Sequence, residues 1–164
     1  MDLAPEVING AVVLNGVDIC STGPDCRPCI ELAVGVHNWL VAHDLKYLIV
    51  DFQDEKEVCS TILTEILQLR KRLPYPFIFC GLMGNPRKVL TSFAYSDHPV
   101  FDVPEDAVAY LKKIKPELLI RDLSSIREHE PIPCTRSRTY RGDDAETGDA
   151  SANESEVEEV EADL

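Results

Sequence analysis

The chain has 164 residues, a hydrophobic content of 45% and a formal net charge of −13. This length allows one domain with a substantial core. No apolar run approaches the roughly 20 residues that cross a bilayer, so we expect no membrane span. The first ten residues have neither the basic start nor the apolar centre of a secretion signal. Six cysteines without such a signal predict reduced thiols and a cytoplasmic location.

The negative charge is concentrated at the end of the sequence. Ten of the 29 acids lie in residues 143–164, which contain no Lys or Arg; this leaves 19 acids against 16 bases elsewhere, a net charge of −3. A nearly neutral body does not fit a nucleic-acid binder, because such proteins depend on basic surfaces. We expect the acidic tail itself to be solvated and disordered.

The predicted elements begin with a β-hairpin. Asn9 and Gly10 stand between two apolar runs, and an Asn-Gly pair in that setting is the strongest short signal for a tight turn. The second strand of the hairpin extends over residues 11–19. Asn15 and Gly16 interrupt this strand, and they are the alternative position for the turn.

Helices and strands alternate in the next part of the sequence. A loop rich in Gly and Pro leads into a helix that starts at Pro28, where proline suits the first turn, and ends near His43. Short continuous apolar runs predict buried strands, and apolar residues at helical spacing predict helices between them. The expected elements are strands over 46–52, 76–82 and 99–103 and helices over 60–73, 85–95, 104–114 and, outside the main sheet, 116–130.

This order predicts an α/β fold with a mostly parallel or mixed sheet of about five strands, flanked by about four helices. We expect one domain over residues 1–115. Residues 116–164 then form a helical or loop extension that ends in the disordered acidic tail.

Three stretches of the sequence carry a family resemblance. The first is the apolar strand that contains Gly16 and Asp18, and the second joins a central strand to a helix start over residues 48–63. The third extends over residues 76–111, and its matching residues are Gly81, Leu82, Arg87, Val89, Leu90, Val100, Phe101 and Glu105. Together these stretches, over residues 5–114, resemble the STAS domain of anti-sigma factor antagonists, stressosome proteins and the cytoplasmic ends of sulfate transporters.

The resemblance implies a non-enzymatic regulatory module that binds a protein partner, such as a kinase-like anti-sigma factor or a signalling assembly. Ser60 aligns with the serine that a partner kinase phosphorylates, Thr61 is a second hydroxyl, and Asp18 belongs to the same binding face. Cys59 and Ile62 stand where the family has Asp and Gly. The unpaired amides and positive potential of a helix start favour a phosphate there. The simpler alternative is that Ser60 or Cys59 only caps the helix.

The cysteines support an alternative function. Cys20, Cys26 and Cys29 lie within ten residues, and Cys59 follows the next strand. If these strands are parallel, the two loops meet at one pole, where four thiolates could ligate zinc or an iron–sulfur cluster. A Cys-x-x-Cys pair at a helix start also fits thiol redox chemistry and resembles thioredoxin, although the later cis-proline strand of that fold has no counterpart here. The remaining interpretation is that these cysteines are structural thiols that bind no cofactor. Cys80, in a buried strand, is expected to act as a small apolar side chain.

Overall fold

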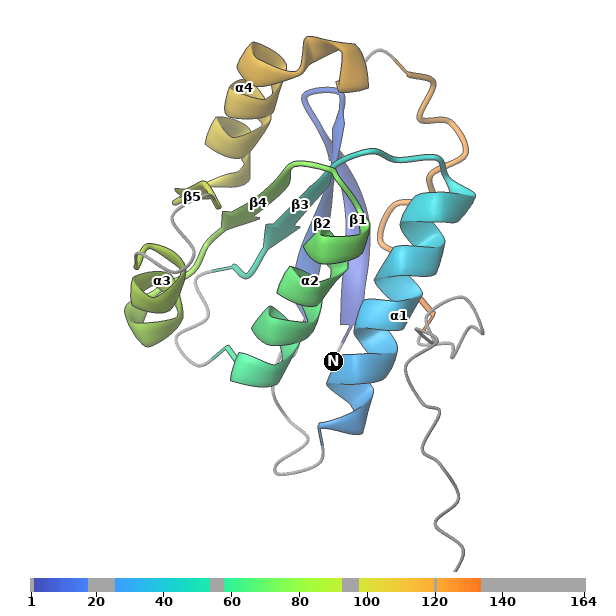
Figure 1. Cartoon of the computed structure of the whole chain (residues 1–164). Coiled ribbons are helices and arrows are strands. Elements are labelled where there is room, and N and C mark those ends of the chain that lie inside the picture. The colour runs from blue at the N-terminus through green and yellow to red at the C-terminus, as the bar shows by residue number, and fades with distance from the viewer. Residues whose placement is uncertain (1, 18–25, 54–57, 93–97, 120, 134–164) are drawn as a thin grey trace, which may run out of the picture.

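The computed structural model describes residues 2–17, 26–53, 58–92, 98–119 and 121–133 (Figure 1). Strands β1 (Asp2–Ile8) and β2 (Ala11–Val17) form an antiparallel hairpin. Asn9 and Gly10 make the turn between them with φ angles of 50° and 81°, as a two-residue turn with a left-handed backbone requires. The predicted turn is therefore confirmed, and Asn15 and Gly16 lie inside β2 instead.

The rest of the sheet is parallel. The strands follow the order β1-β2-β3-β4-β5, and each of the last three runs parallel to its predecessor. Crossover helices join them, as short right-handed connections between parallel strands require. The elements after the hairpin are α1 (Arg27–Ala42), β3 (Leu48–Asp51), α2 (Ser60–Arg72), β4 (Phe77–Cys80), α3 (Gly84–Leu90), β5 (Val100–Phe101) and α4 (Pro104–Ile114). The predicted α/β fold with a mixed five-stranded sheet and four helices is confirmed.

The sheet lies between two layers of helices. Helices α1 and α2 pack side by side on one face, and α4 packs against β1, β3, β4 and β5. Ile49 and Val50 point to opposite faces of β3, yet both are fully buried, so both faces of this strand are covered. The core therefore occupies both sides of the central strands, and the loops at the strand ends are left for function.

Residues 121–133, here called the strap, cover the outer edge of β1. The Ile132 amide donates to the Leu3 carbonyl at 2.9 Å, and the His129 amide donates to the Pro5 carbonyl at 2.8 Å. The Ile132 side chain is 2% exposed and joins the main core, which contributes roughly 2–3 kcal/mol of apolar burial. An uncovered edge strand would offer its backbone to other chains, so the strap also protects against edge-to-edge association.

The strap replaces most of the predicted last helix. Only Pro116–Leu119 forms a short 3₁₀ turn, so the helix expected over residues 116–130 is wrong. Two contacts anchor the strap at its start and its end: Arg121 donates to the Asp44 carboxylate at 2.9 Å, and Pro133 lies against Gly35 of α1. The acidic tail, residues 143–164, lies outside the described residues.

A substitution at Gly35 tests how closely the strap packs on α1. Replacing a glycine inside a helix by alanine ordinarily stabilises a protein by about 0.5–1 kcal/mol. A Cβ at this position would lie 2.3 Å from the Pro133 carbonyl oxygen. We therefore expect Gly35→Ala to lower the free energy of unfolding by about 1–3 kcal/mol instead, measured by urea denaturation.

The control is the same substitution in a chain that ends at Glu130, which lacks the Pro133 carbonyl. In that background Gly35→Ala should become neutral or stabilising, because the close approach is gone. A substitution that stabilises the full chain by the ordinary amount would show that the strap does not pack on α1 as described.

Candidate functional site

The parallel strands place the starts of α1 and α2 at one pole of the molecule (Figure 1). Helices that follow neighbouring parallel strands begin at the same end of the sheet, and this end is where α/β proteins bind their ligands. We call the cluster formed by Cys26, Cys29, Cys59, Ser60 and Thr61 the helix-start pole. Asp18 and Cys20, which we also expected here, lie outside the described residues.

A direct contact joins the two helix starts. The Thr61 hydroxyl, in the first turn of α2, donates to the Cys26 sulfur at 3.2 Å, and Cys26 is the N-cap of α1. The two residues are 35 positions apart in the sequence. The structure thus brings together the two corners that the sequence analysis expected to meet.

Ser60 is the exposed residue of the pole. It is the first residue of α2, whereas the N-cap is Cys59, so the capping alternative applies to Cys59 by position and not to Ser60. The first turn of α2 contains no acidic residue. A group on the Ser60 hydroxyl therefore faces solvent beside the positive potential of the helix start. Thr61, by contrast, is half-buried and its hydroxyl is engaged with Cys26.

The thiol of Cys59 has a perturbed acidity. Burial raises its pKa, but hydrogen bonds to the thiolate outweigh burial and hold the pKa below its usual value. Three donors come from α2, namely the Thr61 amide, the Ile62 amide and the Thr61 hydroxyl, whose single proton goes either to Cys59 or to the Cys26 sulfur, and the fourth is the Cys29 thiol of α1. The neutral Cys59 thiol makes no side-chain capping bond to the described part of α2. The four donors instead stabilise the negatively charged thiolate, which is why they lower the pKa.

Cys80 differs from Cys59 in both burial and acidity. Its side chain is fully buried in β4, and burial together with the nearby carboxylates of Asp51, Glu105 and Asp106 raises its pKa to about 12. It is therefore an uncharged apolar side chain at neutral pH, as expected. No group of three or more metal-ligating side chains gathers among the residues that the structure describes. Because Cys20 lies outside them, the predicted zinc or iron–sulfur site stays a prediction.

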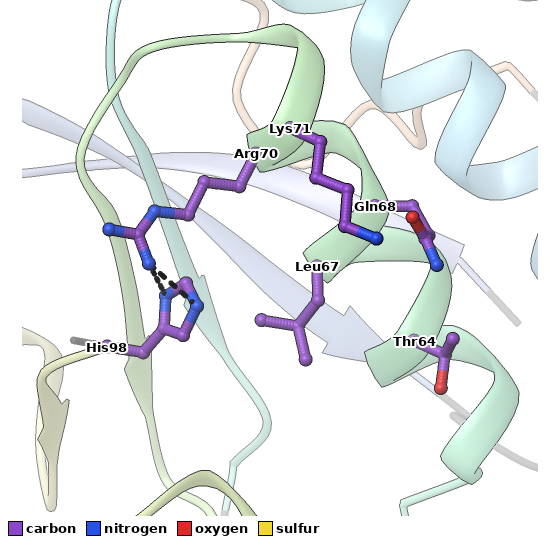
Figure 2. Close-up of a pocket in the computed structure, with 6 residues that line it drawn as sticks. All are labelled: Thr64, Leu67, Gln68, Arg70, Lys71 and His98. Carbon is purple, nitrogen blue, oxygen red and sulfur yellow. Dashed lines mark hydrogen bonds between the residues drawn. The ribbon is translucent and has the colours of Figure 1, made fainter. Parts of the chain in front are cut away.

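A pocket that the sequence analysis did not anticipate opens beside the second half of α2 (Figure 2). It has a volume of about 370 Å³. Arg70 and Lys71 supply the charge among its described lining residues. Its full described lining is Thr64, Leu67, Gln68, Arg70, Lys71 and His98.

His98 fixes the wall of this pocket opposite α2. The Arg70 guanidinium lies 3.0 Å from the His98 Nε2 atom (Figure 2), and because arginine only donates, the imidazole nitrogen accepts. The His98 ring also packs edge-on against Phe79 of β4, with centroids 5.8 Å apart. Arg70 therefore holds its position through a buried ring, and Lys71 remains exposed at the pocket rim.

One face of α2 connects the pocket to Ser60. Positions four, seven and eleven residues after Ser60 lie on the same side of an α-helix, and these are Thr64, Leu67 and Lys71. We call these four residues the α2 stripe; it is about 16 Å long at 1.5 Å per residue. The spacing was visible in the sequence, but only the position of His98 shows that the stripe borders a pocket.

Comparisons with known proteins identify no relative. No protein-family model matches the chain, and neither the curated proteins nor the solved structures contain a significant match. The STAS resemblance therefore rests on the sequence patterns. Among the described helices, none combines the length and apolar character that crossing a membrane demands.

The lowered pKa of Cys59 predicts a distinct alkylation profile. The rate of iodoacetamide modification follows the thiolate fraction, so the pH midpoint for Cys59 should lie below the ordinary value that the same cysteine shows in the urea-unfolded chain. Thr61→Val removes one donor and keeps the side-chain shape, so it should move the midpoint upward. Peptide mass spectrometry across a pH series gives the rate at each cysteine.

Cys80 is the internal control in the same samples, because its pKa of about 12 keeps it unmodified in the folded chain at pH values where Cys59 reacts fully. A Cys59 midpoint at or above the ordinary value would contradict the hydrogen bonding described at this pole.

Proposed function

We propose that this chain is a non-enzymatic regulatory protein-binding module of the STAS kind, which docks a partner along the α2 stripe and is switched by phosphorylation of Ser60. The observation that carries the proposal is the exposure of Ser60 at the start of a helix whose outward face leads to a basic pocket. The sequence resemblance also implies Ser60 as the phosphorylated residue.

The charges of α2 suggest the kind of partner. Arg70, Lys71 and Arg72 occupy its last turn, so the far end of the α2 stripe is basic and favours an acidic partner surface. Leu67 adds an apolar contact in the middle of the stripe. A kinase-like anti-sigma factor or a signalling assembly with an acidic docking face fits this surface.

Phosphorylation would act on this surface through charge. A phosphoserine carries about −1.5 to −2 charges at neutral pH. On Ser60 it is stabilised by the α2 amides, while the same charge repels an acidic partner that lies along the helix. The half-buried Thr61 is the poorer acceptor, because its hydroxyl already bonds Cys26. The switch therefore acts at the exposed end of the stripe and releases the partner.

The test combines modification and binding. We expect a Ser60 phosphopeptide in protein isolated from its native cells, detected by mass spectrometry. Partners captured by the full chain should be lost with Ser60→Glu and with Lys71→Glu, with at least about tenfold weaker affinity, equivalent to roughly 1.4 kcal/mol. Ser60→Ala should retain binding and abolish the phosphopeptide.

Ser125→Glu is the matched control, because it places the same charge on an exposed hydroxyl position outside α2. The proposal fails if Ser60 stays unmodified under all growth conditions, or if Ser60→Glu and Ser125→Glu affect binding equally.

A further inference from the structure

The two helix starts hold a pair of thiols that partner docking does not use. Cys29, in the first turn of α1, lies within hydrogen-bonding reach of Cys59 at the N-cap of α2. Both helices pack side by side against the sheet, so the pair bridges two elements that are distant in the sequence. Cys59 also packs against the core cluster to which Cys29 belongs.

The two thiols differ in their access to solvent. Cys59 is half-exposed, whereas Cys29 is 1% exposed and belongs to the main core. A dissolved oxidant therefore reaches Cys59 first. Cys29 is shielded from the oxidant but not from the neighbouring sulfur, which is the arrangement that favours an attacking thiol and a resolving thiol.

We propose that Cys59 and Cys29 form a peroxide-sensitive dithiol, which closes to an intramolecular disulfide linking the starts of α1 and α2. This site goes beyond the docking function and does not depend on it. The contact across the two helices, the unequal exposure and the donors around Cys59 all lead to the same pair.

The chemistry balances with hydrogen peroxide as the oxidant. The Cys59 thiolate attacks one peroxide oxygen, so an S–O bond forms, the O–O bond breaks, and the leaving hydroxide takes up a proton to become water. The Cys29 thiol then loses its proton and attacks the Cys59 sulfur, which forms the S–S bond and releases the second oxygen as water. The two sulfurs lose two electrons, and the peroxide gains them.

Cys26 has a different place in this arrangement. Its sulfur lies 3.2 Å from the Thr61 hydroxyl oxygen, which donates to it, whereas the thiol that hydrogen-bonds to Cys59 is that of Cys29. The Thr61 hydroxyl also supports the Cys59 thiolate. Thr61 is therefore a positioning residue for the oxidation, and the proposal assigns no step to Cys26.

The test uses the reduced full chain and hydrogen peroxide. A non-reducing digest followed by mass spectrometry should yield one linked peptide pair, joining Cys29 to Cys59, that dithiothreitol reverses. Cys59→Ser should abolish the link, and Cys26→Ser should retain it. Thr61→Val should slow the reaction several-fold at neutral pH, because fewer Cys59 side chains are ionised.

Cys29→Ala provides a positive signal even without a disulfide. Its Cys59 should remain as a sulfenic acid that dimedone traps, whereas the unsubstituted chain should show little trapping. A first product that links Cys26 to either partner, a link that involves Cys20, or accumulation of sulfenic acid on Cys59 in the unsubstituted chain would overturn the proposal. Ser60→Ala should leave the link unchanged, so failure here and failure of the docking function are separable.

Discussion

The parallel registers of β2 with β3 and of β3 with β4 place the candidate functional residues at one pole. Leu14 pairs with Val50, and Asp51 pairs with Cys80, so these strands end at one level and their chains turn in the same direction into helices. Two corners that are more than thirty positions apart in the sequence consequently share one surface. The hydrogen bond between Thr61 and Cys26 follows from this parallel arrangement of the strands.

The two proposals place two kinds of chemistry at one helix start. Cys59 and Ser60 are adjacent residues, and a Cys59 thiolate or a Ser60 phosphate would be stabilised by the same first-turn amides of α2. Two negative charges there repel each other, so a phosphate on Ser60 would raise the pKa of the Cys59 thiol. Modification of the serine and oxidation of the cysteine therefore oppose each other if both occur.

Local patterns predicted the fold well because the signals for it are local. The Asn9–Gly10 turn requires a left-handed backbone that these residue types adopt readily, and short apolar runs such as residues 48–51 bury both faces of a strand. The strap was missed because its hydrogen bonds go to β1, more than a hundred residues away. No local period encodes such pairing, and the apolar spacing of residues 116–130 imitated a helix.

The candidate site was predicted only in part, for a related reason. The meeting of the Cys26 and Cys59 corners follows from parallel topology, which the order of elements reveals. The pocket does not follow from it, because its far wall depends on His98, which reaches α2 from the chain after α3. A lone histidine in sequence gives no indication of that contact.

The most direct test of the account is the proximity of the two helix starts in solution. In a nuclear Overhauser experiment on the reduced chain, the Thr61 methyl group should show cross-peaks to the β-protons of Cys26, as the 3.2 Å contact between their side chains requires. Cross-peaks from that methyl group to α2 alone, with none to α1 in well-resolved spectra, would contradict the shared pole.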